Sequence, residues 1–91
     1  SFIHVKDSPV AGQGLFAKED IPEGVDLGIS HVVVDESIMR TPLGGFVNHS
    51  DDPNCEARLD DDMIRLHVIK DIKAGEEITS KYWLYNLTKP V

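Results

Sequence analysis

Three short segments of this chain carry the side chains that could do chemistry: residues 12–17 (GQGLFA), 45–55 (GFVNHSDDPNC) and 75–82 (GEEITSKY). The middle segment crowds an amide, an imidazole and several short hydrogen-bonding side chains into a stretch that is too polar for a core. The amide of Asn48 both donates and accepts hydrogen bonds, so it suits a ligand that carries amino and carboxylate groups. Gly12 and Gly14 let the backbone bend sharply and approach a ligand without an intervening side chain. These segments are therefore the candidates for a functional site.

Each segment also has a purely structural interpretation. A lone Gly-x-Gly most often forms a simple hairpin turn, Asn48 could cap a turn, and His49 could only pack. Tyr82 could be a buried strand aromatic with a satisfied hydroxyl. Residues 48–50 (NHS) and 86–88 (NLT) also match the glycosylation acceptor pattern, which the missing secretory context disfavours. The functional interpretation depends on the three segments occurring together and in this order.

In this order the three segments resemble the signature of the SET-domain protein lysine methyltransferases, and the likeness runs from Phe2 to about Tyr85. The resemblance implies an all-β, β-clip SET-like fold of several small curved sheets. It also implies that S-adenosylmethionine is the cofactor and that a lysine side chain of a protein accepts the methyl group. The implied cofactor-binding residues are Gln13, Gly14, Leu15, Phe16, Asn48, His49, Tyr82 and Trp83.

The resemblance assigns the catalytic role to Tyr82. Methyl transfer to lysine is an in-line displacement that needs a neutral amine, whereas free lysine has a pKa of about 10.4. Burial in a narrow channel and a nearby sulfonium charge both disfavour the ammonium form. The Tyr82 hydroxyl would then hold the amine nitrogen in line. Trp83 or Tyr85 could cover the adenine and wall the lysine channel, or could instead close a small core.

Several positions depart from the family pattern. Gly45 stands where an arginine is frequent, Ser80 where an aromatic often limits the number of methyls added, and Lys81 where an acid is usual. Only 33 residues lie between Gly14 and Asn48, where SET enzymes usually carry a longer insert, and no cysteine-rich zinc-binding tail follows. These departures favour the alternative that the chain is a non-catalytic SET-fold binding or assembly module. Methylation of a small basic molecule is a third interpretation.

Length and composition limit the classes of protein to which this chain can belong. With 91 residues the chain predicts one minimal domain over 1–91, with a core at about 2–85 and a short tail at 86–91. The lone Cys55 cannot form an internal disulfide, so we expect an intracellular protein, in cytoplasm or nucleus, that is not secreted. One cysteine and four histidines without metal-ligand spacing predict no metal site. No apolar run approaches the length of a membrane span, so no membrane association is expected.

Charge and size predict the partners. The net charge of −7 disfavours nucleic acid and favours a lysine-containing basic protein or peptide as substrate. The compact form without a tail is similar to minimal viral or phage SET proteins, some of which are homodimers. A homodimer is therefore expected, in which the neighbouring subunit could supply the missing wall of the substrate groove.

Short apolar runs broken by glycine, proline and aspartate turns predict an all-β domain with minimal helix content. The predicted strands are residues 2–6, 14–18, 25–27, 28–34, 56–59, 63–69 and 78–84. Residues 60–62 (DDD) predict a hairpin turn. Residues 35–45 are interpreted as a connector with one helical turn at 36–39, stopped by Thr41-Pro42.

An internal echo supports this layout. Residues 20–27 (DIPEGVDL) and 71–78 (DIKAGEEI) share the pattern Asp-Ile-x-x-Gly-x-acid-aliphatic. Each copy predicts a tight turn that feeds a strand, with its glycine, Gly24 or Gly75, at a position that needs positive φ.

Overall fold

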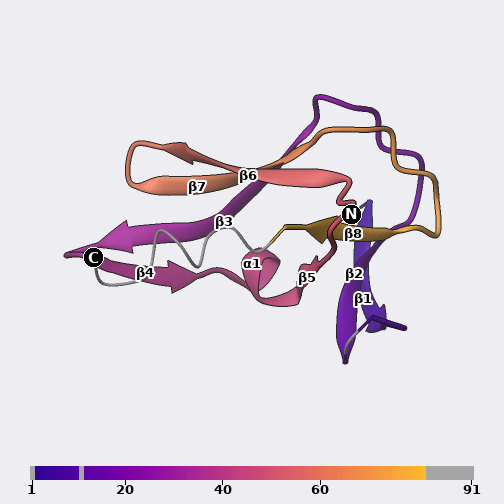
Figure 1. Ribbon diagram of the computed structural model, residues 1–91, viewed down its shortest axis with the longest axis horizontal. Coiled ribbons are helices and arrows are strands. Elements are labelled where there is room, and N and C mark those ends of the chain that lie inside the picture. Colours follow the sequence, from indigo (N-terminus) through magenta and orange to yellow (C-terminus); the bar gives the residue numbers. More distant parts are fainter. Residues whose placement is uncertain (1, 11, 82–91) are drawn as a thin grey trace.

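Backbone hydrogen bonds join the strands of this chain into one curled sheet (Figure 1). The computed structural model describes residues 2–10 and 12–81. The strands are β1 (Ile3–Asp7), β2 (Gln13–Ala17), β3 (Asp26–Val34), β4 (Ser37–Arg40), β5 (Asn48–His49), β6 (Cys55–Asp60), β7 (Met63–Val68) and β8 (Glu77–Ser80). Their order is β1-β2-β8-β6-β7-β3-β4, and β5 pairs with β8. The expected all-β class with little helix is therefore confirmed.

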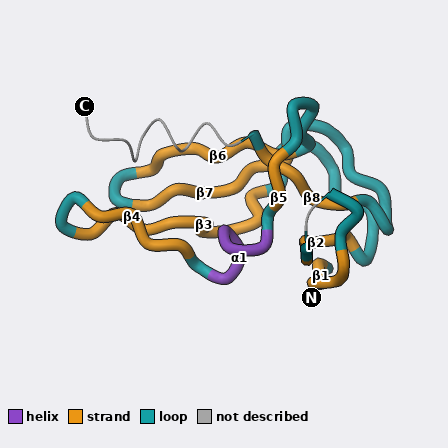
Figure 2. The backbone as a smooth tube through the Cα atoms, turned by 60° about the horizontal axis from the view of Figure 1, so that its bottom comes forward, coloured by secondary structure: helices purple, strands orange, loops and turns teal. Residues whose placement is uncertain are grey.

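The strands form two parts that meet at β8 (Figure 2). The β3–β4 and β6–β7 hairpins lie side by side through antiparallel pairing of β3 with β7. On the other side, β1 and β2 form an antiparallel pair, and β2 continues onto β8. Strand β8 also pairs in parallel with β5 and with the start of β6. Thus β8 holds together segments that are far apart in the sequence.

Two acidic turns close the long hairpins. Asp61 has a φ of 57°, and it lies in the turn that joins β6 to β7, as the run of aspartates predicts. Asp35 and Glu36 have φ of 46° and 66°, which makes them a two-residue turn between β3 and β4. The helical turn expected at 36–39 is therefore wrong. A tight hairpin turn with two residues at positive φ matches the twist of the flanking strands, so strand pairing prevails there.

The single described helix, α1 (Pro42–Phe46), begins at Thr41-Pro42, where the sequence pattern led us to expect a helix to stop. Thr41 is the N-cap, and its Oγ1 accepts a hydrogen bond from Gly44 N at 3.3 Å. Pro42 fits the first helical position because its missing N–H would have no partner there. The Thr41 hydroxyl also donates to Ile29 O at 2.6 Å, which ties α1 to β3. No helix within 2–10 and 12–81 is long and apolar enough to cross a membrane.

Strand β3 is one strand where the sequence predicts two, at 25–27 and 28–34. Its pairing with β7 shifts register between Asp26 and Gly28. Gly28 has a φ of 118°, and its N–H donates to Asp26 Oδ1 at 2.8 Å. The glycine therefore marks a bulge inside a continuous strand, since glycine can adopt this φ at little cost.

The two echoed segments pair with each other. Ile21 and Ile72 form an antiparallel bridge and exchange both backbone hydrogen bonds, at 2.7 and 2.8 Å. Gly24 and Gly75 have φ of 95° and 91°, as predicted for the two turns. The echo in the sequence thus corresponds to one paired structural unit.

The hydrophobic core lies where the two segments joined by the Ile21–Ile72 bridge meet β2, β6, β7 and β8. Its buried residues are Leu15, Ala17, Ile21, Val47, Cys55, Leu66, Val68, Ile72 and Ile78. Burial raises the pKa of the Cys55 thiol to about 12, because the charged thiolate would be poorly solvated there. Cys55 therefore packs as a small apolar residue.

Candidate functional site

The three chemistry-bearing segments converge on β8. Strand β5 runs parallel to it, with Asn48 opposite Thr79 and His49 opposite Ser80. Strand β2, which starts in the glycine turn, runs antiparallel to it. The described parts of the three segments that the sequence proposes for one site therefore lie beside one another along β8.

Asn48 links all three segments through its side-chain amide. Its Nδ2 donates to the carbonyl oxygen of Gln13 at 3.1 Å and to Glu77 Oε2 at 2.8 Å. The amide therefore joins the start of β2 to the start of β8. This places the half-buried Asn48 beside Gln13 and Gly14, which the sequence assigns to the same site.

Gly14 has no room for a side chain. A Cβ atom there would collide with Glu77 Oε2 and would lie 3.0 Å from Asn48 Nδ2. Gly14 does not have a positive φ, whereas Gly12 has a φ of 47°. The glycine turn thus needs Gly12 for its backbone conformation and Gly14 for the space that the Glu77 carboxylate fills.

Ser8 and Glu77 are bonded to each other beside Asn48 and Gly14, and the sequence motifs predicted a role for neither of them. The Ser8 hydroxyl lies 2.7 Å from Glu77 Oε1 and 2.9 Å from Oε2, within donating distance of both oxygens. Ser8 N in turn donates to Gly12 O at 2.8 Å, which closes the loop before β2. The one signal for them in the sequence is that Glu77 lies inside the third segment, residues 75–82.

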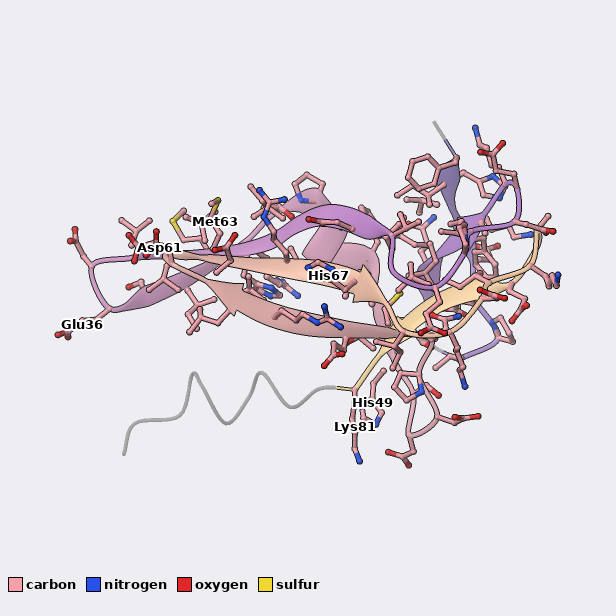
Figure 3. The ribbon with its side chains drawn as sticks, turned by 90° about the horizontal axis from the view of Figure 1, so that it is seen from above. Glu36, His49, Asp61, Met63, His67 and Lys81 are labelled. Carbon is pink, nitrogen blue, oxygen red and sulfur yellow. The ribbon has the colours of Figure 1, made fainter. Side chains whose placement is uncertain are left out.

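His49 is the last residue of β5, and its side chain is partly exposed. Its Nε2 is 3.0 Å from Asp51 Oδ1, and its side chain is 37% exposed. The next residue, Ser50, donates its N–H to Ser80 O at 3.1 Å, which anchors the segment along β8. Figure 3 shows His49 and Lys81 on the same side of the molecule, and Lys81 is exposed.

Leu15 and Phe16 belong to the interior of the domain. Their exposed fractions are 4% and 6%, and Leu15 pairs with Val5 on one side and with Ile78 on the other. The Phe16 ring lies under Lys6, whose Nζ is 4.6 Å from the ring centroid. Contact between either residue and a cofactor stays a prediction.

Asn54 is a second asparagine that holds β8, and the sequence motifs did not predict this role. Its Nδ2 donates to Glu77 O at 2.8 Å, and its Oδ1 accepts from Thr79 N at 2.9 Å. The amide thus bonds to β8 as a neighbouring strand would. This contact fixes the backbone on both sides of Ile78, and with it the Glu77 side chain.

Two site residues of the sequence analysis, Tyr82 and Trp83, lie outside the described residues, as does Tyr85. Ser80, which stands where an aromatic is frequent in the family, is 7% exposed, so its small side chain is buried. Among residues 2–10 and 12–81 no group of three or more His, Cys, Asp or Glu side chains could hold a metal ion.

The fold agrees with comparisons to known proteins. The family model of the SET domain matches residues 26–83, so the chain belongs to the SET domain family. A search of curated protein sequences found no match.

Solved structures show the same fold. A crystal structure of a Plasmodium falciparum protein assigned as a histone methyltransferase has a TM-score of 0.75 at 20% identity, covering 90% of this chain and 93% of that one. A humanized mutant of Chaetomium thermophilum Polycomb Repressive Complex 2 bound to the inhibitor GSK126 has a TM-score of 0.73 at 25% identity. An apo form of that complex with two mutations in Ezh2 has a TM-score of 0.73 at 24% identity. In both, this chain spans 15% of the matched chain.

Proposed function

We propose that this domain transfers a methyl group from S-adenosylmethionine to the side-chain amine of a lysine in a protein. Membership of the SET domain family and the histone methyltransferase among the structural neighbours support the class of reaction. The observation that carries the proposal is the hydrogen-bonded junction of Gln13, Asn48 and Glu77 beside the strand that leads to Tyr82.

The donor set at this junction fits the cofactor. The methionine end of S-adenosylmethionine carries an ammonium and a carboxylate, and the half-buried Asn48 amide is a hydrogen-bonding group of the kind that binds them. Bound S-adenosylmethionine would supply a methyl carbon that an amine lone pair can attack as the carbon–sulfur bond breaks. Asn48, together with the main chain at Gln13, would bind and orient the cofactor.

Tyr82 is the residue to which we assign the positioning of the amine. A hydroxyl within hydrogen-bonding reach of the lysine nitrogen would hold it in line with the methyl group, and such orientation supplies a large part of the rate in displacement reactions. The channel must also favour the neutral amine, since an ammonium has no lone pair. Burial and a nearby positive charge both act in that direction.

The substrate we propose is a lysine in a basic protein. The chain has a net charge of −7, and the exposed acids Asp51 and Asp52 lie on the segment that follows β5. An acidic surface attracts a basic partner and repels nucleic acid. Affinity for a basic peptide should therefore fall as ionic strength rises, because salt screens exposed charges.

We also propose that the domain works as a homodimer, in which the second subunit supplies a wall of the substrate groove. The 33 residues between Gly14 and Asn48 leave little chain for building that wall within one subunit. Light scattering across protein concentrations, read beside specific activity, tests this. A monomer that keeps full specific activity on dilution would rule the shared groove out.

The test of the cofactor is calorimetric titration of S-adenosylmethionine and S-adenosylhomocysteine into wild type, Asn48→Ala and Asp52→Ala. We expect micromolar affinity for wild type, about −8 kcal/mol of binding free energy, and a loss of tenfold or more in Asn48→Ala. Asp52→Ala is the control from the same segment, since its side chain is 95% exposed and pairs with Lys70.

Activity on basic protein substrates then follows, with Tyr82→Phe as the variant that removes only the hydroxyl. If wild type binds neither ligand at millimolar concentration, the methyltransferase proposal fails. The chain would then be better described as a binding or assembly module that keeps the fold without the cofactor. If both ligands bind but Tyr82→Phe retains full activity, the role of Tyr82 is wrong while the cofactor site stands.

A further inference from the structure

One side of the paired hairpins presents an apolar row that crosses three strands. Met63 of β7 lies opposite Val32 of β3, and Val32 lies opposite Met39 of β4. Residues directly opposite each other in paired strands have their side chains on the same side of the sheet. Met39 is 60% exposed, and the other two are half-buried. Figure 3 shows Met63 on the other side of the ribbon from His49 and Lys81, so this row, the hairpin face, is separate from the candidate cofactor site.

Helix α1 packs on the opposite side of the same strands. Adjacent residues of a strand alternate between the two sides of a sheet, so His31, Arg40 and Ile64 lie on the side away from the hairpin face. A Cβ atom on Gly44 of α1 would lie 3.1 Å from His31 Cε1, which places the helix there. The hairpin face therefore lies on the side of the sheet that α1 does not cover.

Four acids lie at the end of the molecule next to the hairpin face. Asp35 and Glu36 form the turn between β3 and β4, and Asp61 and Asp62 form the turn between β6 and β7. Val33 N donates to Asp62 O at 2.7 Å, so the two turns are held together. Figure 3 shows Glu36 and Asp61 at this end. All four are exposed, and none forms an ion pair with another residue of 2–10 and 12–81.

The positive charges beside the hairpin face are matched by acids. Asp60 continues the row on β6, because it pairs directly with the methionine of β7. Arg65 Nη1 lies 3.1 Å from Asp26 Oδ2, and its Nε lies 3.5 Å from Asp60 Oδ2. Arg58 Nη2 lies 3.0 Å from Glu56 Oε2. A partner that approaches the hairpin face therefore meets an excess of negative charge at its border.

The spacing of the row matches one side of an α-helix. Neighbouring strands are about 4.8 Å apart, so three adjacent strands place their side chains over about 10 Å. An α-helix rises about 5.4 Å per turn, so its apolar residues at i, i+3 or i+4, and i+7 are spaced almost equally. Methionine also adapts its shape to different partner side chains, because it is unbranched and polarizable.

Charge favours one occupant of this face over another. The chain has a net charge of −7, so a second copy would bring two acidic borders together, and like charges repel. A helix with lysine or arginine beside its apolar stripe would instead place positive charge against these acids. We propose that the hairpin face binds a basic amphipathic helix of a partner protein. This interaction goes beyond methyl transfer and does not depend on it.

The test uses calorimetry of the full chain with three synthetic peptides of equal length. The first has leucine and lysine at helical spacing, the second has glutamate in place of lysine, and the third has serine in place of leucine. We expect the first to bind, more weakly as ionic strength rises, and the other two to bind at least about tenfold more weakly. No binding of the first peptide to wild type would overturn the proposal.

Met39→Ser and Leu59→Ser form a matched pair of variants. The two side chains are 60% and 61% exposed, so neither change opens a cavity in the core. Leu59 lies opposite Ile64, on the side of α1. We expect Met39→Ser to weaken the leucine–lysine peptide about tenfold, because the methionine leaves water on binding, and Leu59→Ser to bind like wild type. Equal weakening would show no preference for the hairpin face and would overturn the proposal.

The acidic border is tested by Asp61→Asn with Asp62→Asn in one chain. Asparagine keeps the size of the side chain and tolerates the φ of 57° at position 61. We expect severalfold weaker binding at low salt and a shallower dependence on ionic strength. Glu19→Gln with Glu23→Gln is the control, since it removes two exposed charges between β2 and β3. If both double variants act equally, only net charge attracts the peptide, and the proposed site is wrong.

Methyl NMR locates the bound peptide. The chain has two methionines, Met39 and Met63, and both belong to the hairpin face. In protein labelled at methionine we expect both methyl signals to shift as the leucine–lysine peptide is added. Unchanged signals in a sample that binds the peptide would place it elsewhere on the surface and would refute the proposal.

Two other occupants of the hairpin face would be detected in the protein without peptide. Sedimentation velocity would reveal a dimer that Met39→Ser dissociates, which would assign the face to a second copy. Nuclear Overhauser contacts from the Met39 methyl group to ring protons of residues 82–85 would assign it to that segment. Either result contradicts the proposal. None of these outcomes bears on methyl transfer, which is tested separately by titrating the cofactor into Asn48→Ala.

Discussion

Asp20 and Asp71 each cap the turn that follows the other. Oδ1 of Asp20 accepts a hydrogen bond from Ala74 N at 2.8 Å, and Oδ1 of Asp71 accepts one from Glu23 N at 2.8 Å. The two aspartates occupy the same position in the two echoed segments, 20–27 and 71–78. The unit that carries β8 into the site is therefore built with local two-fold pseudosymmetry.

Removing either cap should destabilise the domain. We expect Asp20→Ala and Asp71→Ala each to lower the free energy of unfolding by about 1 kcal/mol, the usual net value of one such hydrogen bond. The double variant should lose less than the sum, because the two caps support one paired unit. Urea denaturation measures all three, with Glu19→Ala, an exposed carboxylate beside Asp20, as the neutral control. Single variants as stable as wild type would contradict the prediction.

Two adjacent glycines of α1 should respond in opposite ways to alanine. A Cβ on Gly44 would collide with the main-chain oxygen of Ser30, whereas a Cβ on Gly45 meets no atom of residues 2–10 and 12–81 within 4 Å. Gly45→Ala should raise the free energy of unfolding by up to about 1 kcal/mol, since alanine favours the helix. Gly44→Ala should lower it by about 1–3 kcal/mol, because α1 must move away from β3. Thermal melting of both variants decides the point, and equal melting temperatures would refute it.

Gly14 and Glu77 should be coupled. Gly14→Ala should lower the free energy of unfolding by about 1–3 kcal/mol, because its methyl group and the Glu77 carboxylate would occupy the same space. Shortening Glu77 to alanine in the same chain frees that space, so the double variant should recover stability relative to Gly14→Ala alone. A double-mutant cycle by urea denaturation measures this coupling. Simple additivity would mean that the collision is relieved elsewhere.

His31 should lower stability in acid. Its Nδ1 lies 2.9 Å from Ser30 Oγ, and Ser30 Oγ donates to Ile64 O at 3.1 Å, so the neutral ring donates from Nδ1. Burial, and then the positive charge of Arg40, lower the pKa of His31 below its ordinary value of 6.5. The unfolded chain therefore binds the proton more readily than the folded one. Stability is fully present above pH 6.5 and is lost as the pH falls through the lowered pKa.

Arg40→Gln tests the electrostatic part of this effect. Without the guanidinium the pKa of His31 should rise toward 6.5, and the acid loss of stability should shrink. NMR titration of the His31 ring measures the pKa, and urea denaturation at a series of pH values measures the stability. Arg58→Gln, on β6, is the control for a change of net charge. An unchanged His31 pKa in Arg40→Gln would leave burial as the only cause.

Strand positions were largely predictable because their signals are local. Alternating apolar residues and the aspartates at 60–62 marked the β6–β7 hairpin, and the glycines of the echo marked two turns with positive φ. The helix was misplaced for a physical reason. Thr41-Pro42 disfavours helix on its N-terminal side but is well suited to begin one, and Asp35-Glu36 formed a hairpin turn.

The site was predictable only in part. The order of the three segments pointed to Gln13, Gly14 and Asn48, and the structure brings these three together. Leu15 and Phe16 follow Gly14 in the same segment, and both are buried, so their contact with a cofactor stays a prediction. A motif read along the chain does not say which of its residues reach a site, because that depends on what packs against each face of the strand.

By itself, then, the sequence determined the strand-rich class, the paired turns and the family signature, since these depend on residue type and short spacing. Only the tertiary structure shows that Ser8 and Asn48 both bond to Glu77, and that the Glu77 carboxylate leaves no room for a side chain at position 14. Ser8 and Glu77 are 69 residues apart, and no local pattern reports a hydrogen bond over that separation. That contact exists because β8 pairs with β2, and this pairing is a property of the folded sheet as a whole.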